Sequence, residues 1–159
     1  MAGSVHDLRP RTQAETDEDG DGDVSVVCQT DAAPRIPEGT YEVGFVSAKK
    51  TDFKRRPLVY LTFQVADPGP YLGVRLVLAC NLRDGRMTES CKYWQAWCLA
   101  AGTRPQRGDR MSTLVFRGLR FRARVRDVTT TWQQAPRAEH MIYSVIDCLL
   151  ERTAGGTGR

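Results

Sequence analysis

Residues 119–128, LRFRARVRDV, alternate strictly between apolar and basic side chains, and this stretch decides the predicted fold. One set of alternate positions is apolar: Leu119, Phe121, Ala123 and Val125. The other set is a row of arginines: Arg120, Arg122, Arg124 and Arg126. A period of two is typical of a β-strand with one face in a core and the other in solvent. The row is therefore either a solvated strand face with acidic cross-strand partners or a surface that binds phosphates.

Spacing favours the phosphate interpretation. Side chains on one face of a strand lie roughly 6–7 Å apart, which is close to the spacing of phosphates along an extended single strand of nucleic acid. The sequence also predicts few acidic residues on the neighbouring strands. We therefore expect the arginine row to contact a polyanion.

Four more stretches have the same strand-like alternation, and turn residues separate them. The predicted strands cover residues 41–50, 58–66, 71–82 and 141–150, in addition to the arginine strand. Residues 51–57 are predicted to be a loop, since Pro57 is poorly suited to a central strand. Asp67-Pro68-Gly69-Pro70 predicts a turn between the second and third strands.

The period changes to that of a helix in residues 88–101, TESCKYWQAWCLAA. Thr88 is the expected N-cap, and Gly102 is the expected C-terminal exit. The face predicted to pack on the sheet is formed by Cys91, Trp94, Cys98 and Ala101. One further helical turn is predicted near residues 111–116.

The predicted fold class is mainly β: a five-stranded OB-like antiparallel barrel with one helix between strands three and four. A split barrel or a meander with the helix on one face is the alternative. Residues 1–36 are predicted to be a disordered acidic tail, residues 37–150 the barrel domain, and residues 151–159 a flexible C-terminal tail.

Charge is distributed unevenly along the 159 residues. Residues 1–36 hold eight acidic and three basic residues, whereas the rest of the chain holds 11 acidic and 20 basic residues. The predicted domain is therefore basic, which favours a polyanionic partner. Five cysteines without framework spacing favour free thiols in a reducing compartment. No apolar run is long enough for a membrane span, so we expect a cytoplasmic protein that does not enter membranes.

Candidate binding residues follow from the OB-like arrangement, in which ligands cross strands two and three between two loops. Aromatic side chains that stack bases, set among cations, are what single-strand binding requires. The stacking candidates are Tyr60, Tyr71 and Trp132. The cationic candidates beyond the arginine row are Arg75, Lys50, Lys54, Arg55 and Arg56.

No motif for a nucleophile, a dinucleotide or a phosphate-binding loop is present in the sequence. The cysteines lack the spacing of a zinc site. We therefore expect no catalytic residues, no metal and no cofactor, and we interpret the chain as non-enzymatic.

Several local sequences resemble a group of small bacterial proteins associated with phages, plasmids and integrative elements. They are Ile36-Pro37-Glu38-Gly39-Thr40-Tyr41, Lys54-Arg55-Arg56-Pro57-Leu58-Val59-Tyr60-Leu61, Pro68-Gly69-Pro70 with Leu72-Gly73-Val74-Arg75-Leu76, and Tyr143-Ser144-Val145-Ile146-Asp147. The layout is also loosely similar to that of phage single-stranded-DNA-binding OB proteins. These motifs are turns and strand entries, so the resemblance implies a fold and a mobile-element setting but assigns no residue a role.

The sequence thus predicts a module of a mobile genetic element that binds single-stranded nucleic acid, DNA in particular, during replication or recombination. The alternative is a protein-interaction adaptor that docks a partner through a strand edge or through the acidic tail.

Overall fold

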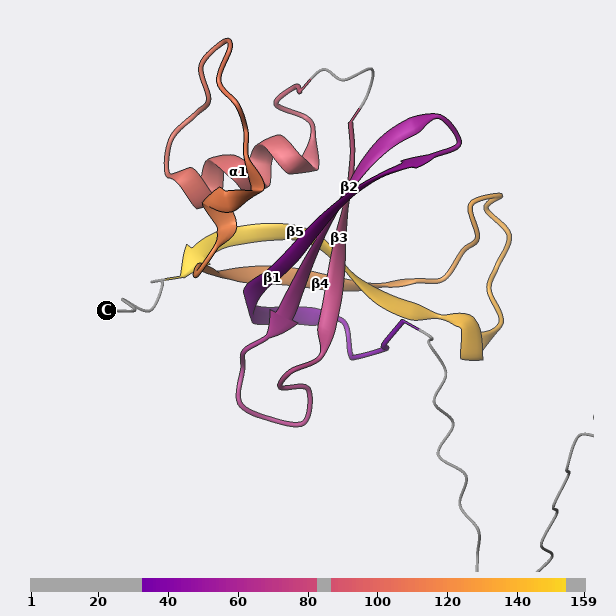
Figure 1. The fold of residues 1–159 in the computed structure, drawn as a ribbon. Coiled ribbons are helices and arrows are strands. Elements are labelled where there is room, and N and C mark those ends of the chain that lie inside the picture. The colour runs from indigo at the N-terminus through magenta and orange to yellow at the C-terminus, as the bar shows by residue number, and fades with distance from the viewer. Residues whose placement is uncertain (1–32, 83–86, 154–159) are drawn as a thin grey trace, which may run out of the picture. The chain divides into compact units, whose positions relative to one another are not determined.

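A computed structural model describes residues 33–82 and 87–153 of the chain. The elements, in chain order, are β1 (Gly39–Phe53), β2 (Arg56–Val65), β3 (Arg75–Asn81), α1 (Lys92–Ala101), η2 (Thr113–Phe116), β4 (Arg120–Val128), η3 (Glu139–Met141) and β5 (Tyr143–Thr153). Here η marks a short 3₁₀ helix. Figure 1 shows the five strands with α1 near one end of them.

The strands form one antiparallel sheet in the order β3-β2-β1-β4-β5. Its two edge strands, β3 and β5, contact each other, but no described residues join them by a hydrogen-bonded ladder. The prediction of a mainly β, five-stranded antiparallel sheet with one helix after the third strand is confirmed. Closure into a barrel is not confirmed.

The alternation that predicted β4 is confirmed by its burial. Phe121, Ala123 and Val125 are buried, and the four arginines between and beside them are exposed. β2 follows the same rule, because its inward positions Val59, Leu61, Phe63 and Val65 are all buried.

Aromatic rings fill the centre of the core. The ring of Phe116, at the end of η2, lies with its centroid 5.5 Å from that of Phe45 and 6.2 Å from that of Phe121. Tyr93 of α1 also packs on Phe116, with ring centroids 6.2 Å apart, and its hydroxyl donates to the Met111 carbonyl oxygen at 2.6 Å. The short helix η2 thus connects α1 to the core, and the predicted helical turn near residues 111–116 is confirmed.

The helix begins later than predicted and buries a different face. Its N-cap is Cys91 rather than Thr88, and its buried residues are Tyr93, Ala96 and Ala100. The small and aromatic residues on this face allow the helix to pack closely on η2 and β5. Hydrophobicity alone favours the predicted face. Gly102 ends the helix as predicted, with φ of 72° and its N–H bonded to the Cys98 carbonyl.

The first connection is a tight hairpin rather than the predicted loop over residues 51–57. β1 and β2 stay paired up to Phe53 and Arg56, and Pro57 lies opposite Asp52. The two turn residues, Lys54 and Arg55, have φ of 48° and 64°. Positive φ at both central positions is typical of a type I′ turn, which suits the twist of a hairpin.

The folded domain begins before residue 37, the predicted start. Ile36 is buried in the core, and its N–H donates to the Ser144 hydroxyl oxygen at 2.9 Å. The Ser144 N–H donates in turn to the Pro34 carbonyl oxygen. Residues 34–36 therefore pack against β5, and only residues 1–32 of the predicted tail lie outside the described residues, as do residues 154–159 at the C-terminus.

The sequence also predicts free cysteine thiols and no membrane-spanning segment. The four described cysteines are free thiols, and burial raises the pKa of Cys80 to about 12. In the part of the chain that the structure describes, no helix has the length and apolarity needed to cross a membrane. Within the same residues, no three His, Cys, Asp or Glu side chains gather closely enough to hold a metal ion.

Candidate nucleic-acid interface

Every arginine of the predicted row has a carboxylate partner on a neighbouring strand. Arg120 lies 3.8 Å from Glu42 of β1, and Arg122 lies 3.3 Å from Glu151 of β5. Arg124 and Arg126 share Asp147 of β5. The expectation that few acids flank this strand is therefore wrong, because it rested on strand pairings that a single sequence does not reveal.

Asp147 reaches two arginines because it is the extra residue of a β-bulge. The ladder pairs Arg124 with Cys148 and Val125 with Ile146, which leaves Asp147 without an opposite residue. A bulge re-aims the side chain of its extra residue. The carboxylate accepts from Arg124 Nε at 3.0 Å, from Arg126 Nε at 3.1 Å and from Lys92 Nζ of α1 at 3.4 Å.

Two of these cations, Arg124 and Lys92, lower the pKa of Asp147. The hydrogen bond from Arg124 is the main cause that lowers the Asp147 pKa, and partial burial opposes the shift while Lys92 adds to it. One negative charge thus balances three positive charges, so this end of the row keeps an excess of positive charge. The Arg124 and Arg126 side chains are at least half exposed, so each ion pair contributes little to stability.

A groove of about 1000 Å³ lies next to this charged cluster. The consecutive residues Val145 and Ile146 both line the groove, although their side chains point to opposite faces of the sheet. The groove therefore runs along the edge of β5. Ala79 and Asn81 of β3 form part of the opposite wall. The groove therefore lies between the two edge strands of the sheet, where no ladder joins them.

The groove combines aromatic, cationic and hydroxyl side chains. The aromatic residues that line it are Phe53, Trp132 and Tyr143, the cationic ones are Lys92, Arg126 and Arg137, and the hydroxyl-bearing ones besides Tyr143 are Thr88, Ser90, Thr130 and Thr131. Among the described residues, no Asp or Glu side chain lines it. Such a surface can stack planar groups and can attract an anion.

The connection from β4 to η3 displays Trp132 at the groove. Thr130 pairs with Pro136 in an isolated bridge, and the Arg137 N–H donates to the Thr129 carbonyl oxygen. These contacts make residues 129–137 a small hairpin with Trp132 near its tip. Trp132 is 66% exposed, so this hairpin presents an aromatic ring to solvent.

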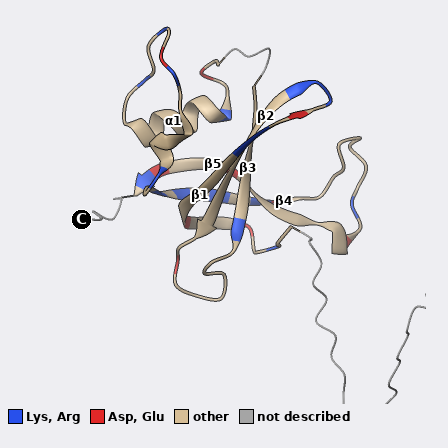
Figure 2. Cartoon of the chain, in the orientation of Figure 1, with Lys and Arg blue, Asp and Glu red and all other residues tan. Residues whose placement is uncertain are grey.

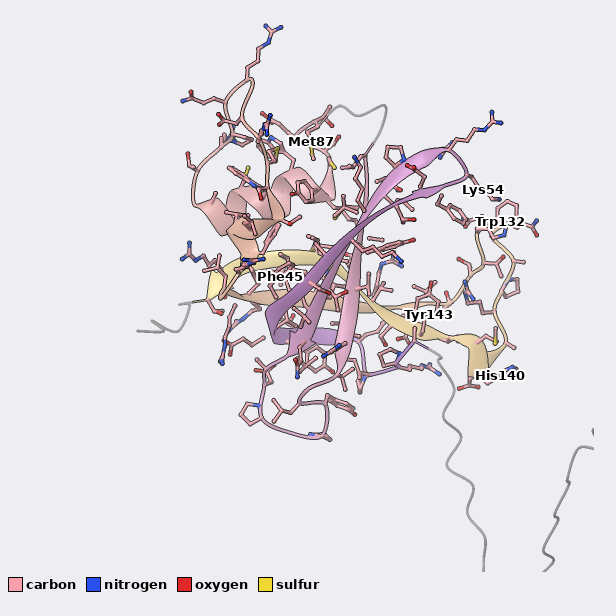
Figure 3. All side chains as sticks on the ribbon, viewed as in Figure 1. Phe45, Lys54, Met87, Trp132, His140 and Tyr143 are labelled. Carbon is pink, nitrogen blue, oxygen red and sulfur yellow. The ribbon has the colours of Figure 1, made fainter. Side chains whose placement is uncertain are left out.

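Lys54, from the tip of the β1–β2 hairpin, covers this ring. Its Nζ lies 3.0 Å from the centroid of the Trp132 ring. Figure 3 shows the two labelled side chains close together, each from its own connection. A lysine ammonium over an indole is attracted by the ring quadrupole, by about 0.5–1 kcal/mol at an exposed site.

Arg137 and Tyr143 form a second cation and aromatic pair in the groove. The guanidinium carbon of Arg137 lies 5.1 Å from the Tyr143 ring centroid. Its Nε donates to the Thr130 carbonyl oxygen at 2.9 Å, which fixes its direction. The remaining donors of this guanidinium face no carboxylate among the described residues.

The structure brings together only part of the predicted set. Trp132 and Arg126 line the groove, and Lys54 lies at its rim through its contact with Trp132. Arg55 completes the hairpin turn, and Arg56 pairs with Phe53 in the ladder. Figure 2 shows the basic hairpin tip in blue, together with the blue segments of β4.

The other predicted residues lie outside the groove. Tyr60 is half-buried on β2 opposite Ala79, and Lys50 is exposed on β1 opposite Val59. Arg75 is the first residue of β3, and Asn81, which lines the groove, is the last. Tyr71 is partly buried and packs against the core, with its ring centroid 6.2 Å from that of Tyr41.

Four aromatic or cationic groove residues were missed by sequence reasoning: Phe53, Lys92, Arg137 and Tyr143. Phe53 precedes the basic turn and is 49% exposed, and an aromatic residue beside a turn was the one available signal. Lys92 lies far from Arg137 and Tyr143 in the sequence, and the three line one groove only because α1 lies close to β5 and to the connection that precedes it. No protein-family model matches the chain, and no curated protein is significantly similar to it in sequence.

Proposed function

We propose that the protein is a non-enzymatic module that binds single-stranded nucleic acid, DNA in particular, in the groove between the edge strands β3 and β5. The observation that carries the proposal is the composition of the groove: three aromatic and three cationic side chains, and no carboxylate among the described lining residues. Stacked bases contribute about 1–3 kcal/mol each, and cations beside them hold the phosphates.

The strand order supports a finer interpretation as an OB-like barrel. In such barrels the ligand lies between the connection of strands one and two and that of strands four and five. Here these two connections meet through Lys54 and Trp132. We further propose that the module serves a mobile genetic element in replication or recombination, a setting that rests on the resemblance of its turns and strand entries.

The proposal shifts the binding surface from the arginine row to the groove. Three of the four arginines lie outside the groove lining, and their guanidiniums contact carboxylates. Arg126 belongs to both surfaces, since it lines the groove and contacts Asp147. The row then supplies a long-range positive field, and Arg126, Arg137 and Lys92 supply the contacts.

Fluorescence anisotropy tests the function directly. A labelled strand of about 16 nucleotides, the upper end of what one OB-fold covers, is titrated with the protein over a range of salt concentrations, beside the matched duplex. We expect preferential binding of the single strand, with an affinity that falls steeply as salt rises. Equal affinity for both forms would indicate only a basic surface, and no binding at low salt would refute the proposal.

A protein-interaction adaptor is the second candidate, and the two edge strands favour it. Within the described sheet, β3 and β5 each pair with one strand only, and an extended peptide can add to such an edge. Under this alternative, oligonucleotides bind weakly, whereas capture from lysate returns one protein stoichiometrically.

A further inference from the structure

The contact between Lys54 and Trp132 covers the most exposed aromatic surface of the groove. The Trp132 side chain is 66% exposed, and the Lys54 ammonium lies 3.0 Å from its ring centroid. A nucleobase that stacks on a ring needs that same position over the ring face. In the free protein the cation and a base would therefore compete for one face of Trp132.

The backbone of the β1–β2 hairpin supports a specific role for Lys54. Lys54 and Arg55 have φ of 48° and 64°, a left-handed conformation that suits Gly or Asn and strains longer side chains. Strain of this kind gathers at binding and switch regions. Two cations therefore occupy the tip of this turn at a conformational cost, and one of them covers the Trp132 ring.

We infer that Trp132 is a nucleobase-stacking surface that Lys54 occupies in the free protein and releases on binding. This inference rests on the proposed function of the groove. When a base stacks on Trp132, it displaces the ammonium, and Lys54 then pairs with a phosphate of the same strand. The Lys54 contact thus exchanges an aromatic partner for an anionic one, so little cationic interaction is lost when the ring is uncovered.

The exchange predicts opposite effects of one substitution on two probes. A neutral-backbone oligothymine analogue, such as a peptide nucleic acid, offers bases but no phosphates. Lys54→Ala removes the competitor for the ring and should tighten binding of this probe by about two- to five-fold, the value of an exposed cation–π contact. With DNA, the same variant also loses a phosphate contact, so its salt slope should fall by about 0.7.

Three further variants isolate the contribution of the Trp132 ring. Lys50→Ala removes an exposed cation from β1 of the same hairpin, and it should leave affinity for the neutral probe unchanged because no described contact joins Lys50 to an aromatic ring. Trp132→Leu removes the stacking surface, and Lys54→Ala added to this background should no longer tighten binding. Lys54→Gln, with a side chain of similar length, should reproduce the gain in the wild-type background.

The outcomes distinguish this inference from the proposed function on which it rests. The exchange would be overturned if Lys54→Ala bound the neutral probe no more tightly than wild type. It would also be overturned if the wild-type protein bound single-stranded DNA but did not bind the neutral probe. Failure of wild-type protein to bind single-stranded DNA at low salt would instead overturn the proposed function.

Discussion

Arg126 and Arg122 provide a direct comparison between the groove and the arginine row. Both lie on β4 with exposed guanidiniums, and each lies within 3.3 Å of a carboxylate oxygen. Arg126 lines the groove, whereas Arg122 does not. If the groove is the interface, Arg126→Ala should weaken binding of single-stranded DNA much more than Arg122→Ala does.

The magnitude follows from the contacts. Either substitution removes one positive charge, so the long-range field falls equally in both variants. Arg126→Ala also removes a charge-assisted contact to phosphate, worth about 1–2 kcal/mol after allowance for its half exposure, which corresponds to roughly five- to thirty-fold in affinity. The salt slope of this variant should fall by about 0.7, the contribution of one phosphate on a single strand.

The assay is anisotropy with the labelled single strand, and urea unfolding of both variants is the control for folding. Asp147 keeps Lys92 and Arg124 when Arg126 is removed, so stability should change by less than about 1 kcal/mol. Equal losses of affinity in the two variants would refute the reasoning, since the row would then act uniformly and the groove would have no special role.

Three more substitutions test the structure itself. Asp147→Asn should lower the free energy of unfolding by about 1 kcal/mol. Because the pKa of Asp147 is lowered in the folded protein, wild-type stability should fall as pH drops below about 4. The stability of the variant, measured by urea titration, should change less with pH over this range. Ser144→Ala leaves the Ile36 N–H without its acceptor and should cost about 1–3 kcal/mol, with faster amide exchange at Ile36. Replacing Lys54-Arg55 by Asn-Gly should raise the urea midpoint while lowering affinity for single-stranded DNA.

Each of these results has a clear opposite. A stability profile of Asp147→Asn that is parallel to wild type below pH 4 would show that folding does not lower the pKa of Asp147. Unchanged exchange at Ile36 would mean that residues 34–36 do not depend on Ser144. A lower urea midpoint for Asn-Gly would show that the left-handed turn conformation is not strained.

Local periodicity predicted the strands well because burial acts on each strand separately. The alternation in β2 and β4 marked their buried residues correctly, since a period of two leaves only two choices of face. The helix was harder to predict. Its buried face holds two alanines beside Tyr93, and hydrophobicity favoured the larger Trp94 and the cysteines, which are only half-buried.

Features that depend on strand register could not be predicted from the sequence. Asp147 meets two arginines only because a bulge in β5 shifts the pairing by one residue, and no local signal marks that bulge. The contact between Lys54 and Trp132 joins residues far apart in the chain. Both residues were candidates from composition, but their meeting depends on the paths of two hairpins.

The arginine row shows why the density of one charge along a strand is a weak guide to a binding site. Four arginines on one face repel one another, and the sheet offsets this repulsion with carboxylates on both flanking strands. The paired arginines are thereby less available to a ligand, because a phosphate must compete with a carboxylate already in place. Arg137 in the groove is in a different setting, since no acid belongs to the described lining and its guanidinium contacts no carboxylate among the described residues, whereas Lys92 and Arg126 share Asp147. Positive charge that is not already balanced nearby, rather than its density in the sequence, should therefore determine where a polyanion binds.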